Sequence, residues 1–286
     1  MRRPFLISCW ALVLATALLH ACFAGRVPAQ DEVQTSNPEA GGEHLRLETE
    51  HGPVHLWRPA HYDQRTAGMV IYIHGYYTSV DQTWADDHLA EQFQASGRNA
   101  LFIVPRAPQS NSEDVSWKSL GDLLRAIESH TTFHLPPGPL VVMGHSGAYR
   151  TMILWLRDPR VQYVILLDGL YGGQAEFRSW LRRPSRSKPH RMVLVANDTW
   201  WVSNLFARRV YGTARRGSIP ATSSGFTPRE ISARLLFLRS QYDHSEMISE
   251  GKVIPVLLQI APLKPLVASP KPTPAKNPHN PAAHPQ

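Results

Sequence analysis

The chain has 286 residues, 43% of them hydrophobic, which is enough for one large domain or two small ones with a substantial core. Its formal net charge at pH 7 is +7, yet no nucleic-acid-binding motif accompanies the positive charge, so we expect no nucleic-acid partner. The two cysteines, Cys9 and Cys22, both lie near the start of the chain, which excludes a cysteine nucleophile or a cysteine metal site from the remainder.

The beginning of the chain has the pattern of an export signal. Residues 5–24 are largely apolar, two arginines precede them, and small residues surround Ala24. We expect a signal peptide at 1–24 and a secreted or periplasmic protein. The alternatives are an uncleaved membrane anchor and a lipoprotein that carries its lipid on Cys22.

Two further stretches differ from the rest in composition. Residues 25–43 are polar, which predicts a flexible leader. Residues 263–286 are rich in Pro, Ala, Lys and Asn without an apolar pattern, which predicts a disordered tail. We therefore place the folded domain at residues 44–262.

In chain order, the domain begins with a hairpin and two buried strands. Alternating residues on either side of a turn at Gly52 predict two antiparallel strands. The nearly continuous apolar runs at 69–73 and 100–104 predict strands that are buried on both faces. Between them, a capping box at residues 79–82 predicts one helix that ends at Gly97.

The second half of the domain repeats the alternation of helix and strand. Apolar residues at helical spacing predict a helix over 117–127. Apolar runs predict strands at 140–143, 163–167, 192–195 and 235–238. Strands that alternate with helices predict an α/β fold, with a mostly parallel central sheet and helices on both faces.

One stretch carries the main chemical signal. The strand at 140–143 runs into Gly144, Ser146 follows two residues later, and the small residues Gly147 and Ala148 come before a helical pattern. This order is typical of a nucleophile elbow, a strained turn that presents a serine hydroxyl above a sheet. The last motif position is usually Gly and is Ala148 here, and a chance turn between strand and helix is the alternative interpretation.

Acidic residues and a histidine follow at later strand ends. Asp168 and Asp198 each come directly after an apolar strand, and His244 follows the last one. This chain order, together with the elbow at Ser146, resembles the α/β-hydrolase fold family over residues 45–260. The resemblance implies a Ser-His-Asp triad with Ser146 as nucleophile and His244 as base. It leaves two positions for the acid, of which Asp198 is favoured over Asp168.

The resemblance also implies an oxyanion hole formed by two backbone amides. One donor is the amide of Gly147, the residue after the nucleophile. The other is the amide of Tyr76, because His74 and Gly75 resemble the oxyanion loop of the family. No His-Glu-x-x-His pattern and no Gly-rich phosphate loop is present in the sequence, so we expect no metal site and no cofactor.

The implied activity is an exported serine hydrolase that cleaves esters or amides through an acyl-enzyme, whether as an esterase, a lipase, a peptidase or an amidase. Its substrate is then a small-molecule or polymer ester or amide. Aromatic residues in the connection 199–231 either line a substrate pocket or pack a helix. Arginine clusters at 182–188, 208–209 and 215–216 either are solvated loops or attract an anionic surface of the cell envelope. The alternative function is a non-catalytic binding protein of the envelope on the same fold.

Overall fold

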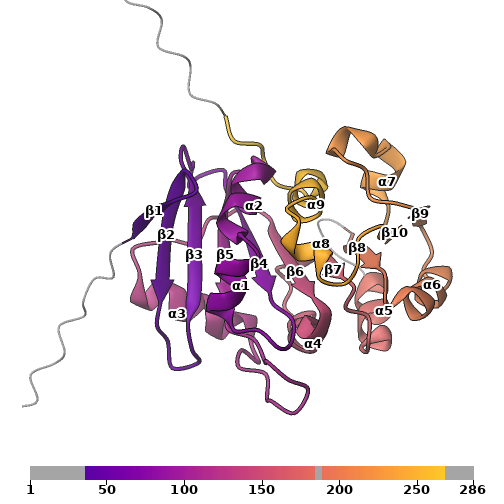
Figure 1. The fold of residues 1–286 in the computed structure, drawn as a ribbon, viewed down its shortest axis with the longest axis horizontal. Helices are drawn as coiled ribbons and strands as arrows, with labels where there is room; N and C mark the ends of the chain where they lie inside the picture. Colours follow the sequence, from indigo (N-terminus) through magenta and orange to yellow (C-terminus); the bar gives the residue numbers. More distant parts are fainter. Residues whose placement is uncertain (1–35, 184–188, 268–286) are drawn as a thin grey trace, which may run out of the picture. The chain divides into compact units, whose positions relative to one another are not determined.

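A single twisted sheet organises the part of the chain that the computed structural model describes, residues 36–183 and 189–267 (Figure 1). Its ten strands follow the order β1-β2-β3-β5-β4-β6-β7-β8-β10-β9. The strands are β1 (Asn37–Glu39), β2 (Gly42–Leu47), β3 (Val54–Pro59), β4 (Gly68–Ile73), β5 (Ala100–Pro105), β6 (Leu140–His145), β7 (Val161–Leu167), β8 (Arg191–Ala196), β9 (Thr213–Arg216) and β10 (Leu235–Arg239).

The sheet is parallel from β5 to β9 and antiparallel at the β1 edge. Strands β2 and β3 form the expected hairpin, in which Leu45 pairs with Leu56, and β3 joins β5 in antiparallel orientation. From β5 onward every pairing is parallel. The continuous apolar runs of β4, β5 and β6 are buried throughout, which confirms the predicted mostly parallel α/β fold.

Helices cover both faces of the sheet, as expected. Alternate strand residues divide between two cores, so that Ile71 packs in one and Val70 in the other. The first core is closed by α3 to α6 and the second by α1, α2 and α9. The helices are α1 (Val80–Asp86), α2 (Leu89–Ser96), α3 (Leu120–His130), α4 (Tyr149–Trp155), α5 (Gln174–Arg182), α6 (Trp200–Arg208), α7 (Pro228–Ser232), α8 (Glu246–Ser249) and α9 (Ile254–Ile260).

The predicted single helix before Gly97 is two helices. Its capping box is present, since the Ser79 hydroxyl accepts from the Gln82 amide and the Gln82 side chain accepts from the Ser79 amide. The helix is interrupted at His88, which adopts a left-handed conformation with φ of 49°. The Gln92 side chain donates to the carbonyl group of Asp87 at 2.6 Å and holds this corner.

The folded region extends beyond the predicted boundaries. Residues 37–43 were expected in the flexible leader but contain β1 and the start of β2. At the other end the amide of Leu266 donates to the carbonyl of Gly97 at 2.8 Å. Strand β9, which sequence periodicity did not predict, pairs with β10 at the sheet edge.

Several predictions fall on parts of the chain that are not described. The signal peptide, most of the leader, the tail from residue 268 and the arginine-rich residues 184–188 lie outside the described residues. Inside the described ranges, every helix is too short or too polar to cross a bilayer.

Candidate active site

Ser146 stands at a strained turn between strand and helix. Strand β6 ends at His145, a short 3₁₀ turn covers Ser146–Ala148, and α4 follows. Ser146 itself has φ of 52°, a conformation that side-chain-bearing residues adopt only when the surroundings impose it. The strand, turn and helix expected around Ser146 are therefore present.

Small residues make this turn sterically feasible. A Cβ atom on Gly144 would lie 2.5 Å from the Met152 sulfur and 2.8 Å from the Cβ of Ala148. A Cβ on Gly147 would lie 2.5 Å from the ring of Tyr76. The methyl group of Ala148 at the last motif position is accommodated because Gly144 leaves that space empty.

Asp168, not Asp198, lies against His244. Asp168 directly follows β7, has φ of 42° and is 0% exposed, and its Oδ2 accepts a 2.8 Å hydrogen bond from Nδ1 of His244. Asp198 is exposed, and its backbone amide donates to the same Oδ2 at 3.0 Å. The preference for Asp198 as the acid is therefore corrected, because Asp198 contributes its main chain, not its carboxylate, to this contact.

The carboxylate of Asp168 is held by the chain that follows β8. It accepts from the amides of Asn197 and Thr199, both at 2.9 Å, and from the Thr199 hydroxyl at 2.7 Å. Burial alone would raise the pKa of Asp168, but the hydrogen bonds from His244, Thr199 and Asn197 hold that pKa well below its usual range. Asp168 is therefore ionised at neutral pH.

His244 lies in the loop after β10 and is half-buried. Its hydrogen bond to Asp168 raises the pKa of His244 above the ordinary value, while burial acts in the opposite direction. Because Asp168 is an acceptor only, Nδ1 of His244 carries the proton and Nε2 keeps its lone pair when the ring is neutral. Both His244 and Ser146 line the same cavity.

His145 is a site residue that the sequence reasoning missed. Its Nε2 donates to the backbone carbonyl of His244 at 2.9 Å, and the two ring centroids lie 4.4 Å apart. Burial, then the neighbouring His244, lower the pKa of His145 to about 3, so the ring is neutral. The only sequence signal for it was a polar residue at the end of a fully apolar strand, directly before Ser146.

The loop after β4 lies beside the elbow, as expected for an oxyanion loop. His74 donates from Nδ1 to the carbonyl of Gly75 at 2.8 Å and accepts at Nε2 from the amide of Ala107 at 2.9 Å. A Cβ on Gly75 would lie 3.0 Å from the Cβ of Ser146, so this backbone contacts the serine. Within the described residues the Tyr77 amide is bonded to Gln109 whereas the Tyr76 amide has no acceptor.

Arg150 of α4 anchors the Tyr76 side chain. Its Nη1 donates to the Tyr76 hydroxyl at 3.1 Å and to the carbonyls of Ser110 and Asn111 at 3.2 and 3.0 Å. The Tyr76 ring meanwhile packs against Gly147. The two residues expected to supply oxyanion donors, Tyr76 and Gly147, are therefore in contact, and Arg150 holds the Tyr76 side chain in place.

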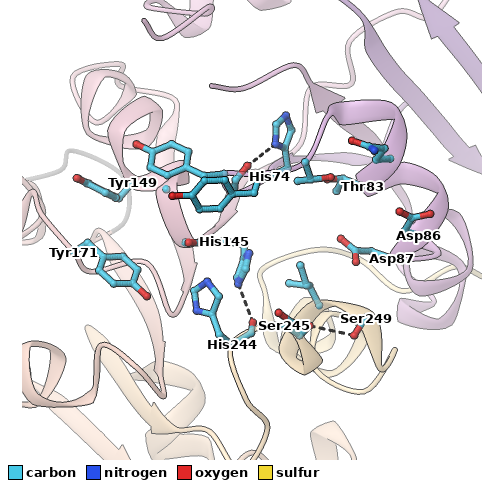
Figure 2. A pocket seen from close by; sticks show the side chains of 18 of the residues that line it. His74, Thr83, Asp86, Asp87, His145, Tyr149, Tyr171, His244, Ser245 and Ser249 are labelled. Atoms are coloured by element: carbon cyan, nitrogen blue, oxygen red, sulfur yellow. Dashed lines mark hydrogen bonds between the residues drawn. The ribbon is translucent and has the colours of Figure 1, made fainter. Parts of the chain in front are cut away.

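A cavity of about 770 Å³ opens above these residues (Figure 2). Tyr149 and Tyr171 lie on one side of it, and Asp86 and Asp87 lie on the other. Burial, then the charge of Asp86, raise the pKa of Asp87 to about 6. Four tyrosines in all line the cavity, at positions 76, 77, 149 and 171.

The aromatic residues of the connection 199–231 do not line this cavity. Trp200 stacks on Phe237 with ring centroids 5.3 Å apart, and Phe206 is buried in the core. The helix-packing interpretation therefore holds for these two, whereas Trp201 and Tyr211 are exposed to solvent.

Asp168, Asp198 and His244 form the one cluster in the described ranges whose potential metal-ligating atoms all lie within 4.8 Å of one another. Both oxygens of Asp168 and Nδ1 of His244 already form hydrogen bonds. A metal ion would have to displace those bonds, so the arrangement fits a hydrogen-bonded pair better than a metal site. The charge of Asp198 instead adds to the field that raises the pKa of His244.

No family model and no curated protein sequence matches the chain. Solved structures do match. The feruloyl esterase module from Clostridium thermocellum, in complex with sinapinate, is 11% identical, with 78% of this chain and 93% of that chain covered and a TM-score of 0.51. A structure designated FAE is also 11% identical, with 80% and 92% covered and a TM-score of 0.54. The likeness at this identity shows the fold, and the chain has the α/β-hydrolase fold that its sequence predicted.

Proposed function

We propose that this protein is a serine hydrolase that cleaves esters or amides through an acyl-enzyme on Ser146. The observation that carries the proposal is the 2.8 Å hydrogen bond between His244 and the buried Asp168, at the cavity that Ser146 lines. A serine hydroxyl is a weak nucleophile at neutral pH and needs an adjacent base, and the neutral His244 has one ring nitrogen left for this role.

The proposed reaction follows from these groups. As the Ser146 oxygen attacks the carbonyl carbon of the substrate, Nε2 of His244 takes the hydroxyl proton. The protonated His244 then gives this proton to the leaving alcohol or amine, and the acyl group stays on Ser146. In the second half, His244 takes a proton from a water molecule as this water attacks the acyl-enzyme. His244 then returns that proton to the Ser146 oxygen, which leaves as the carboxylic acid is released. Asp168 stays ionised and stabilises the imidazolium that forms in each half of the reaction.

The negative charge on the carbonyl oxygen needs donors in the transition state. The amides of Gly147 and Tyr76 are the proposed pair, because their residues pack together beside Ser146. Loss of one such donor typically lowers kcat by about 100-fold to 1,000-fold. The short helix that follows the elbow adds favourable main-chain dipoles at the same place.

The cavity supports a substrate with an aromatic or otherwise bulky group. Tyrosine rings provide flat apolar surface with hydroxyl groups at the edge, and Tyr77 and Tyr171 are 93% and 52% exposed beside the cavity. Aryl esters are therefore the first class to test, and the similar fold of a feruloyl esterase module supports the same choice. Matching anilides test the amide alternative.

The proposal includes export from the cytoplasm. It rests on the apolar residues 5–24 behind Arg2 and Arg3. Determination of the mature amino terminus in a host with a secretory pathway tests it. A chain that begins at residue 25 supports export, a lipid-modified Cys22 supports the lipoprotein alternative, and an intact chain in the cytoplasm contradicts both.

Labelling with a fluorophosphonate probe tests the hydrolase proposal. We expect the parent protein to react and the Ser146→Ala and His244→Ala variants to fail. The matched control is Ser232→Ala, a serine on α7 outside the cavity, which we expect to label as the parent does. If the folded parent stays unlabelled, the activity proposed here is wrong and the envelope-binding alternative takes its place.

A further inference from the structure

Helix α6 presents apolar side chains to solvent. Its inward face is formed by Ser203, Phe206 and Ala207, which are buried against the sheet. The opposite face carries Trp201, which is 69% exposed, and Leu205. The turn after the helix adds Tyr211, which is 92% exposed, and Val202 is exposed beside Trp201. Large apolar groups gathered on one exposed face usually mark an interaction site.

Unpaired arginines surround this apolar face. Residues 199–229 contain five arginines and no Asp or Glu. Arg216 pairs with Glu230, and Arg215 donates to the Asn204 side chain at 2.8 Å. Arg208 and Arg209 are exposed and make no ion pair within the ranges that the structure describes. Exposed arginines without a carboxylate partner leave their charge available to an external anion.

The arginines also share an open hollow. Residues 207–213 and Arg215 line a depression of about 620 Å³ at the end of α6. Two of its lining residues, Thr213 and Arg215, belong to β9. Strand β9 is the edge strand opposite β1 (Figure 1). The backbone of 197–199, which holds Asp168, leads directly into α6. The surface therefore begins beside the candidate active site.

We propose that this α6–β9 surface, formed by Trp201, Val202, Leu205, Arg208, Arg209, Tyr211 and Arg215, docks the protein on an anionic phospholipid bilayer. Trp201, Leu205 and Tyr211 enter the interfacial layer, and the guanidinium groups bind lipid phosphates. An aromatic and aliphatic face bordered by arginines has the chemistry of helices that lie in a membrane interface. Arginine keeps its charge at the headgroups while its aliphatic stem covers apolar surface.

Vesicle binding by the full chain tests this proposal independently of hydrolysis. Sedimentation with vesicles of phosphatidylcholine alone, and with added phosphatidylglycerol, measures partitioning. We expect at least about tenfold stronger binding to the anionic vesicles, since each arginine near such a surface strengthens binding about fivefold. Any contribution of residues 5–24 is common to the parent and all variants, so comparison between them isolates the α6–β9 surface.

Four variants separate the outcomes. Arg208→Gln combined with Arg209→Gln loses at least about tenfold in anionic-vesicle binding, and Trp201→Ala loses roughly tenfold through lost apolar burial. The matched controls Arg65→Gln, in the turn before β4, and Leu154→Ala, on α4, change exposed positions outside this surface and are expected to bind as the parent does. All four retain the parent's circular dichroism and its hydrolysis of a soluble ester.

Three results overturn the proposal. The first is equal binding of the parent to neutral and anionic vesicles. The second is unchanged vesicle binding by the α6–β9 variants. The third is an arginine-dependent interaction that Trp201→Ala leaves intact and that inorganic phosphate abolishes, because this identifies a soluble-anion site and not a membrane surface. Loss of ester hydrolysis with vesicle binding intact would concern the proposed activity alone.

Discussion

His244 and His55 each contact a carboxylate over the same 2.8 Å, but in different surroundings. His244 uses Nδ1 for Asp168, and its Nε2 has no partner among the residues that the structure describes. His55 has both ring nitrogens bonded, Nε2 to Asp81 and Nδ1 to His44 at 2.9 Å. The first histidine keeps a nitrogen available for a substrate, whereas the second uses both within the fold.

The surroundings also act oppositely on the two pKa values. The hydrogen bond to Asp168 raises the pKa of His244. Burial, then the neighbouring His44, lower the pKa of His55 to about 4, although Asp81 acts the other way. His55 is 3% exposed and stacks on Trp84 with centroids 4.8 Å apart. A histidine–carboxylate pair is therefore not a catalytic feature by itself; it becomes one when a spare nitrogen shares a cavity with a nucleophile.

The largest expected effect tests the choice of acid. Asp168→Asn removes the negative charge and replaces one carboxylate oxygen with an amide NH2 group that can donate to Nδ1 of His244. This favours the wrong tautomer of the ring, and the imidazolium is no longer stabilised. We expect kcat to fall by about 10⁴-fold. The comparison variant Asp198→Asn keeps its main-chain contact and is expected to lose less than about tenfold, through the weaker field at His244. Steady-state kinetics with an aryl ester measures both, and a larger loss for Asp198→Asn would contradict the assignment.

The next effect concerns the loop that carries His244. His145→Phe keeps a buried ring but removes the hydrogen bond to the His244 carbonyl. We expect kcat to fall by up to about 100-fold, because a small displacement of a catalytic group has a large kinetic effect. His145→Gln can again donate to this carbonyl and is expected to recover part of the rate. Equal losses in both variants would assign His145 to packing alone.

The corresponding change at His55 is expected to affect stability and not catalysis. His55→Phe preserves stacking on Trp84 but leaves Nε2 of the half-buried His44 without its partner, while Nδ1 of His44 keeps its contact with Glu39. The free energy of unfolding is expected to fall by about 1–3 kcal/mol, the cost of an unsatisfied buried polar group. Urea unfolding measures this loss, with kcat expected to stay within about twofold of the parent. A fall in kcat without a loss of stability would connect His55 to the active site and would contradict the purely structural role assigned to it here.

The smallest expected effect is a shift of the pH profile. Only neutral His244 accepts the Ser146 proton, so kcat/KM rises with pH through the pKa of His244, at a midpoint above its ordinary value of 6.5. Stability runs the other way: because the folded pKa is raised, the His244–Asp168 contact contributes fully below pH 6.5, and this contribution is lost as pH rises through the folded pKa. In the Asp168→Asn variant, the midpoint of the pH profile of the residual kcat/KM is expected to lie at lower pH than in the parent. An unchanged midpoint would mean that Asp168 does not set this pKa.

The sequence alone determined the elements whose signals lie in consecutive residues. The apolar runs of β4, β5 and β6 can be buried only between two layers of helices, and this predicts a parallel sheet. The small residues around Ser146 predict a sharp turn because larger ones would collide there. The sequence also predicted the capping box at residues 79–82, and it shows directly that His244 follows Ser146 along the chain. These features depend on local sterics and hydrogen bonds.

Only the tertiary structure decided which groups meet. Strands β7 and β8 are neighbours, so Asp168 and Asp198 follow strand ends at the same edge of the sheet. One carboxylate oxygen of each and one ring nitrogen of His244 lie within 4.8 Å of one another. The left-handed turn at Asp168 and the amides of 197–199 then favour Asp168, and no local pattern encodes that choice. The bond from His145 to His244 likewise spans 99 residues of chain. Contacts between distant segments depend on strand pairing and packing, and these exist only once the whole sheet has formed.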